Sequence, residues 1–212
     1  MNDREWLLAI DTSTDWCGIA LTNGRDWAEL NWSSGRHQTI QVLPEIERLA
    51  NRMATSIGQV GAIAVAIGPG SFSGLRVGLS LAKGFVLAEQ IPLIGVSTLD
   101  VTTHGWDAGG TLVTGVIRAG RKRYVWADHA SLSDIKSGEQ RELVDSVGSG
   151  SRVVGEIDED VAASLTATGC AVPPEPARRR RAGSLAALAW PRWLAGETDD
   201  PGALEPIYIH PA

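Results

Sequence analysis

A glycine-rich segment between two apolar stretches constrains this sequence more than any other feature. The residues from Val60 to Ile67 form a continuous apolar run, which predicts a buried strand. Gly68–Gly74 follows directly, and Leu75 to Gln90 then combines apolar and small residues in a pattern that predicts a long helix. A strand, a tight glycine turn and a helix in this order are typical of an α/β fold.

The rest of the pattern also favours an α/β layout, with mixed sheets flanked by helices. The chain opens with three predicted antiparallel strands, and Asn23-Gly24 indicates a hairpin between the second and the third. Apolar residues at helical spacing predict an amphipathic helix over Thr39–Met53. Further strands are expected at Ile91–Val96, Thr111–Ile117, Arg123–His129, Gln140–Val147 and Ser151–Gly155, and further helices at Glu159–Thr168 and Ser184–Leu194. We expect two lobes, residues 1–100 and residues 101–212, and an extended segment at Glu205–Ile209.

Composition excludes several classes of protein. The 212 residues include 19 Lys and Arg against 25 Asp and Glu, a net charge of −6 that argues against a dedicated nucleic-acid binder. The two cysteines, Cys17 and Cys170, lie far apart, so we expect no structural zinc site and no metal. No apolar run approaches the roughly 18 residues of a membrane span. The N-terminus does not resemble a signal peptide, so we expect a cytoplasmic protein without membrane contact.

Two polar turns are the first candidate sites, and each has two explanations. The start of a helix after Gly68–Gly74 favours an anion, and Ser71 and Ser73 add hydroxyl donors. The segment lacks the Gly-Lys-Ser/Thr of a P-loop, and a tight turn that needs glycine for steric reasons explains it equally. The Asp11–Thr14 turn could hold a magnesium-phosphate group, or its side chains could satisfy the turn backbone.

Other polar residues allow weaker hypotheses. The basic runs Arg178–Arg181 and Arg118–Arg123 could contact RNA phosphate, although a solvated linker and a solvated hairpin tip explain them too. His37 has no second metal ligand four residues on, and a surface or capping role is expected for it. No Cys/His or Ser/His/Asp set is suggested, which makes a peptidase the least supported function.

Four segments resemble one known family. They are Leu8–Thr14, Gly68–Gly78, Ile91–Leu99 and Glu205–Ile209. The chain resembles the TsaB family, also called YeaZ, of bacterial tRNA threonylcarbamoyladenosine synthesis. The resemblance covers the first 100 residues closely and the rest loosely. It implies a two-lobed actin-like fold, of the sugar-kinase and ribonuclease H-like (ASKHA) type.

The resemblance also implies a function. It suggests a non-catalytic scaffold subunit, required with TsaD and TsaE for threonylcarbamoyl transfer to adenosine 37 of ANN-decoding tRNAs. The implied partners are a TsaD-like subunit in a heterodimer and a TsaE-like ATPase, with a homodimer when the chain is alone. Contact with tRNA is expected only through the complex. The resemblance implies no cofactor of the chain's own, with ATP or ADP as a candidate at the partner interface.

The resemblance assigns residues to this role. The two metal-binding histidines of TsaD correspond here to Thr98 and Thr102, which are poor transition-metal ligands. The partner contact is expected on the helices Thr39–Met53 and Ser73–Gln90. Candidate residues for the partner or for an interfacial nucleotide are Gly70, Ser71, Phe72, Ser73, Gly74, Arg76, Leu79 and Lys83, and Asp11, Thr12 and Ser13 are candidates for a vestigial phosphate loop.

Two departures from the family pattern accompany these assignments. The turn after Asp11 lacks the glycine that phosphate-binding members of the superfamily usually have. The Arg118–Arg123 run stands where the family usually has an acidic pair, so the local charge is reversed. The alternative function is a stand-alone ASKHA-type ATPase or small-molecule kinase that uses Asp11 and the Gly68–Gly74 loop.

Overall fold

The structure is a computed structural model, and it describes residues 4–35, 37–106, 110–120, 122–129 and 134–209. The chain divides into two compact units. Unit 1 comprises Met1–Ser97 and Arg181–Ile207, and unit 2 comprises Thr98–Arg180 and Tyr208–Ala212. Each unit has its own sheet and its own apolar core.

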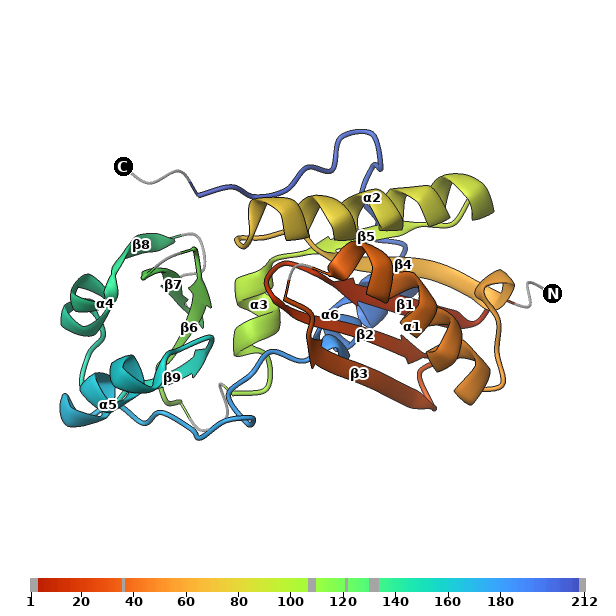
Figure 1. Cartoon of the computed structure of the whole chain (residues 1–212). Coiled ribbons are helices and arrows are strands. Elements are labelled where there is room, and N and C mark those ends of the chain that lie inside the picture. Colours follow the sequence, from red (N-terminus) through yellow and green to blue (C-terminus); the bar gives the residue numbers. More distant parts are fainter. Residues whose placement is uncertain (1–3, 36, 107–109, 121, 130–133, 210–212) are drawn as a thin grey trace. The chain divides into compact units, whose positions relative to one another are not determined.

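Unit 1 is built on a five-stranded mixed sheet in the order β3-β2-β1-β4-β5 (Figure 1). Its strands are β1 (Trp6–Asp11), β2 (Trp16–Thr22), β3 (Trp27–Ser33), β4 (Val60–Ala66) and β5 (Leu93–Val96). β1, β2 and β3 form an antiparallel meander, whereas β1, β4 and β5 run parallel. The expected opening meander and the two later strands are therefore confirmed.

Helices cover both faces of this sheet (Figure 1). One face carries α1 (Gln38–Arg52) and α2 (Phe72–Glu89), and the other carries α6 (Ala182–Leu194); a short 3-10 helix, η1 (Ile57–Gln59), precedes β4. Alternate strand residues such as Leu8 and Ile10 form one core with Ile46 of α1 and Ala82 of α2. The burial of this apolar surface is the main stabilising contribution to such a layer.

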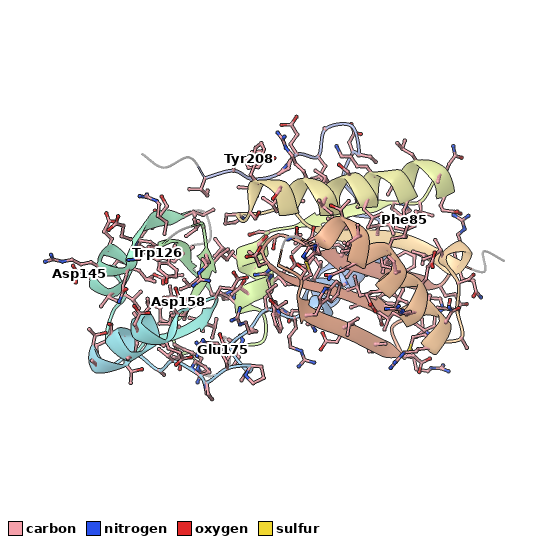
Figure 2. The ribbon with its side chains drawn as sticks, viewed as in Figure 1. Phe85, Trp126, Asp145, Asp158, Glu175 and Tyr208 are labelled. Carbon is pink, nitrogen blue, oxygen red and sulfur yellow. The ribbon has the colours of Figure 1, made fainter. Side chains whose placement is uncertain are left out.

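Unit 2 contains a four-stranded mixed sheet in the order β8-β7-β6-β9. Its elements are α3 (Thr98–Thr103), β6 (Val113–Arg118), β7 (Arg123–Asp128), β8 (Lys136–Glu139), α4 (Gln140–Ser146), β9 (Arg152–Gly155) and α5 (Glu159–Ala167). Trp126, labelled in Figure 2, packs with Leu143 of α4 and Leu165 of α5 in the main core. Leu99 of α3 packs separately with Ile117 and Ala127.

The expected strand over Gln140–Val147 is wrong, because most of that segment forms α4. Leu143 and Val147 are buried but Asp145 between them is exposed, whereas a strand would place all three side chains on the same face. At the start of the helix, the Glu139 N–H donates to the Glu142 carboxylate at 2.7 Å. This carboxylate satisfies a backbone donor that a helix leaves free at its first turn.

The expected division at residue 100 also differs from the two units at the C-terminal end. Arg181–Ile207 belongs to unit 1, because α6 packs against the sheet of unit 1. The extended segment at Glu205–Ile209 is confirmed, and the Ile207 N–H donates to the Ile67 carbonyl at 2.7 Å. The expected class of mixed sheets flanked by helices is confirmed. In the described part of the chain, no helix combines the length and the apolar character needed to cross a membrane.

Candidate functional site

The turn after β1 lies directly against the glycine segment and the start of α2. The Ser71 N–H donates to the Ser13 carbonyl at 2.6 Å, and the Thr12 hydroxyl donates to the Gly74 carbonyl at 2.7 Å. The structure therefore brings together the two candidate turns that the sequence identified separately. Their contact is made by hydrogen bonds between the turns themselves.

Glycine is required in this segment because the turn approaches so closely. A Cβ atom added at Gly70 would collide with the Ser13 carbonyl oxygen, and one at Gly74 would collide with the Thr12 carbonyl oxygen. One added at Gly78, a turn further along α2, would collide with the Thr12 hydroxyl. Of the two explanations offered by the sequence, the steric one accounts for these glycines.

The polar side chains of the turn are directed into this packing. The Asp11 carboxylate accepts hydrogen bonds from the Ser13 N–H at 2.9 Å and from the Ser13 hydroxyl at 2.6 Å. Asp11, Thr12 and Ser13 are at most 3% exposed. In this arrangement they do not fit a phosphate group, because their polar atoms are covered and are used within the chain.

The expected contact residues on α2 fall into two groups. The Phe72 side chain is 57% exposed, and the Arg76 guanidinium lies 3.8 Å from the centre of its ring. Ser73 is also exposed, and Lys83 is half-buried. Leu79, however, is buried in the core of unit 1. Its assignment to the partner surface is corrected, because it lies on the sheet side of α2.

Large apolar side chains face solvent on both α1 and α2, and we call these four residues the outer helix face. Their exposed fractions are 70% for Ile40, 41% for Leu43, 57% for Phe72 and 75% for Leu87. The helical spacing of the apolar residues in Thr39–Met53 predicts one stripe that includes Ile40, Leu43 and Ile46, but of these three only Ile46 is buried. Exposed apolar side chains gathered on neighbouring elements are typical of interaction surfaces.

A glycine on the exposed side of α2 strengthens this interpretation. Gly84 is exposed, and no heavy atom of the described residues beyond its immediate neighbours and helix lies within 4 Å of an added Cβ. Glycine in a helix interior costs about 1 kcal/mol relative to alanine. None of the described residues of unit 1 requires this cost, whereas a second helix packed closely on α2 would.

The Arg178–Arg181 run combines two buried arginines with two that are partly or largely exposed. Arg180 is buried and pairs with the Glu156 carboxylate at 3.0 Å. Arg178 is buried as well, and its guanidinium donates to the Ile157 carbonyl at 2.8 Å. Arg179 pairs with Glu175 at 2.7 Å, and Arg181 pairs with Glu29. Neither the RNA contact nor the solvated linker, the two explanations that the sequence allowed, fits the two buried arginines.

The other basic run contributes to a polar network in unit 2 around Asp158, which is labelled in Figure 2. The Arg118 guanidinium pairs with one Asp158 carboxylate oxygen, and the Tyr124 hydroxyl donates to the other at 2.7 Å. Burial acts to raise the pKa of Asp158, but hydrogen bonds from Arg118 and Tyr124 outweigh it and lower that pKa. Burial and the bond to Asp158 raise the pKa of Tyr124. Arg121 lies outside the described residues.

The positions implied to replace a metal-binding histidine pair lie on α3. Thr98 and Thr102 are both buried, and the Thr102 hydroxyl donates to the Thr98 carbonyl at 2.7 Å. That hydroxyl is therefore used inside the helix. Among the residues that the structure describes, no group of three or more His, Cys, Asp or Glu side chains could hold a metal ion.

Comparison with known proteins shows the family to which the chain belongs. The family model described as "TsaD: tRNA N6-adenosine threonylcarbamoyltransferase" matches residues 33–152, more than half of the chain. The "tRNA threonylcarbamoyladenosine biosynthesis protein TsaB" of Escherichia coli is 36% identical over 141 residues, covering 65% of this chain. The chain belongs to the TsaB (YeaZ) family. The expected family is therefore confirmed.

Other members and neighbours of the TsaB family differ in how much of the chain they cover. TsaB of Haemophilus influenzae is 38% identical over 93 residues. The chain spans 61% of the length of the Escherichia coli protein and 39% of the Haemophilus one. An uncharacterized protein of Mycobacterium tuberculosis is 29% identical, covering 96% of this chain and 90% of that protein. The structure of YeaZ from Pseudomonas aeruginosa shares the fold, with a TM-score of 0.78, 21% identity and coverage of 96% and 99%.

Proposed function

We propose that this chain is a non-catalytic subunit of tRNA threonylcarbamoyladenosine synthesis, and that it binds a TsaD-like transferase through the outer helix face. The names of its relatives support the pathway. The observation that carries the binding role is the exposure of Ile40, Leu43, Phe72 and Leu87 on two neighbouring helices.

The outer helix face suits a partner that also presents helices. Burial of a leucine or phenylalanine side chain contributes about 1.5–3 kcal/mol, so a few such residues can carry an interface. The open position at Gly84 would let a partner helix approach the backbone of α2 closely. Arg76, held over the Phe72 ring, would add a positive charge at the edge of the contact. A nucleotide at the partner interface, ATP or ADP, would meet this charge.

The chemistry would belong to the partner. A TsaD-like subunit would transfer the threonylcarbamoyl group to adenosine 37, and a TsaE-like ATPase would act in the same complex. The buried hydroxyl of Thr102 and the buried Asp11 turn support a role without catalysis by this chain. The net charge of −6 supports contact with tRNA through the complex only.

A pair of matched variants tests the binding surface. Leu87→Asp places a charge on the outer helix face, and Leu194→Asp places one on α6, on the other side of the sheet. The two leucines are 75% and 69% exposed, so both variants are expected to fold. Calorimetry with the TsaD-like subunit of the same organism should show a Kd about 30-fold higher for Leu87→Asp, equivalent to ~2 kcal/mol. The Kd of Leu194→Asp should not change. Equal Kd values for both variants would contradict the proposed surface.

Reconstitution tests the pathway role. Modified adenosine in tRNA would be measured with the TsaD-like and TsaE-like proteins and the enzyme that forms the threonylcarbamoyl adenylate, with and without this chain. The proposal requires modification to depend on the chain, and to fall with Leu87→Asp in proportion to lost binding. Modification at full rate without the chain would overturn the proposal.

A further inference from the structure

One buried donor in unit 2 has no hydrogen-bond partner among the residues that the structure describes. The Trp126 side chain, labelled in Figure 2, lies in the main core of unit 2 and is 4% exposed. Its indole Nε1–H is buried and donates to no atom of the described part of the chain. Buried polar groups are nearly always hydrogen-bonded, because a buried donor without an acceptor lowers stability. Trp126 therefore requires an acceptor from another source.

A small cavity lies beside this side chain. Its volume is about 10 Å³. It is formed where the end of β7, the start of β8 and the end of α4 meet, and its lining residues are Trp126, Ala127, Asp128, Asp134, Lys136, Ser146 and Val147. A single water molecule needs roughly 10–15 Å³, so a ligand here has one non-hydrogen atom.

The strand register explains why polar groups gather at this cavity. Trp126 of β7 is paired with Lys136 of β8, so their side chains share one face of the sheet. Asp128 lies two residues after Trp126 in the same strand and therefore shares that face. The same face carries α4, because Trp126 packs with Leu143 of this helix. The fold thus places a carboxylate on the side of the sheet to which the indole ring belongs.

Two carboxylates at the cavity can accept hydrogen bonds. Asp128 accepts from the Thr114 hydroxyl at 2.6 Å, but a carboxylate has about four lone-pair positions, so capacity remains. Asp134 forms an ion pair with Lys136 at 3.9 Å, which also leaves lone pairs on its oxygens. A ligand in the cavity therefore meets the indole donor of Trp126 together with two carboxylate acceptors.

We propose that this cavity binds one water molecule, which accepts from the Trp126 Nε1–H and donates to the Asp128 and Asp134 carboxylates. Water fits because it accepts and donates at once, and buried waters typically make about three hydrogen bonds. A metal or ammonium ion cannot accept from the indole, and a halide ion would face two carboxylates. A bridging water joins polar groups that lie too far apart for a direct bond. The inference does not depend on the proposed function.

Nuclear Overhauser spectra of the full, isotope-labelled chain test the water directly. The Trp126 indole proton should give a cross-peak to water with opposite signs in laboratory-frame and rotating-frame spectra, which marks a bound water rather than proton exchange. Trp32 is the matched control, because its indole N–H donates to the Gln41 side chain at 3.0 Å, and it should give no such cross-peak. A missing cross-peak at Trp126, or equal cross-peaks at both residues, would overturn the proposal.

The Ser146 hydroxyl also lines the cavity, and its exchanging proton would produce a similar cross-peak. This hydroxyl donates to the Leu143 carbonyl at 3.0 Å, and the proposed water does not need it. In Ser146→Ala, the Trp126 cross-peak to water should therefore persist. Its loss in this variant would assign the signal to the hydroxyl and contradict a bound water.

A high-resolution crystal structure of the unaltered chain gives a second, independent measurement. It should show one solvent peak within about 3 Å of the Trp126 Nε1 atom, at hydrogen-bonding distance from a carboxylate oxygen. A protein oxygen at that distance from Nε1, in place of the solvent peak, would refute the water site.

Discussion

The two units of this chain hold their backbone segments together in opposite ways. In unit 1, the turn at Asp11–Thr14 meets α2 because Gly70 and Gly74 have no side chains to separate them. In unit 2, the segment after α5 is held by Arg178 and Arg180, whose long side chains are buried with their charges. The junction in unit 1 requires glycines without side chains, whereas the junction in unit 2 requires long charged side chains that are paired inside the protein.

The difference shows that a short sequence motif does not determine whether its residues are buried or which residues they contact. A glycine segment before a helix is typical of an anion site, and here it is a packing surface. A run of arginines is typical of a solvent-exposed or nucleic-acid-binding segment, whereas two of the four arginines here are buried. In both cases the deciding groups, the Thr12 carbonyl and the Glu156 carboxylate, lie far away in the sequence.

The largest expected effect comes from breaking the buried pair in unit 2. Arg180→Ala leaves the Glu156 carboxylate buried without this cation, which typically costs about 3–5 kcal/mol. The free energy of unfolding, measured by urea titration, should fall by that amount. Arg180→Met combined with Glu156→Leu should recover most of the loss, because apolar residues can replace such a pair.

Arg181→Ala is the matched control for this variant. It removes the neighbouring arginine of the same run, whose side chain is 69% exposed and pairs with Glu29. Exposed pairs contribute up to about 1 kcal/mol. Equal losses from Arg180→Ala and Arg181→Ala would contradict the distinction between buried and exposed members of the run.

An intermediate effect is expected at the glycine junction of unit 1. Gly74→Ala adds a methyl group against the Thr12 carbonyl, and overpacking of this kind typically costs about 1–3 kcal/mol. Gly84→Ala, in the same helix, adds its methyl group to open space and should stabilise by up to about 1 kcal/mol. Thermal unfolding of the two variants measures whether each substitution lowers or raises the stability of the chain. Helix propensity alone predicts a gain for both, so a stabilised Gly74→Ala would refute the packing role.

The sequence predicted the sheet of unit 1 because its strands are continuous apolar runs separated by clear turn signals. It missed α4, because a seven-residue helix with few apolar positions gives a short and ambiguous pattern. The place of α6 could not be predicted either, since residues 181–207 return to unit 1 after residues 98–180 have formed most of unit 2.

The candidate site was predicted in position but not in role. The sequence identified both turns, yet only the structure shows that they pack against each other. It placed Leu79 on the partner surface, whereas the helix phase turns Leu79 toward the sheet and leaves Leu87 exposed. The strand order that the structure gives to the described residues, with β3 at one edge of the sheet of unit 1, is likewise not contained in the positions of the strands along the sequence.

The smallest expected effect concerns the hydrogen-bonded network of Arg118, Tyr124 and Asp158 in unit 2. Like the buried arginines this network is polar, but the side chains of its ion pair are only partly buried. The pKa of Asp158 is lowered in the folded state. The contribution of this carboxylate to stability is therefore present above the ordinary carboxyl pKa of about 3.9 and is lost as pH falls through the lowered value. Asp158→Asn should therefore flatten the loss of stability in acid. Tyr124→Phe removes one of the two hydrogen bonds, and it should cost about 1 kcal/mol at neutral pH and flatten the acid loss less. Urea titrations between pH 7 and pH 2.5 measure both slopes. An acid loss that is the same in Asp158→Asn and the unaltered chain would mean that the hydrogen bonds to Asp158 do not contribute to the stability of unit 2.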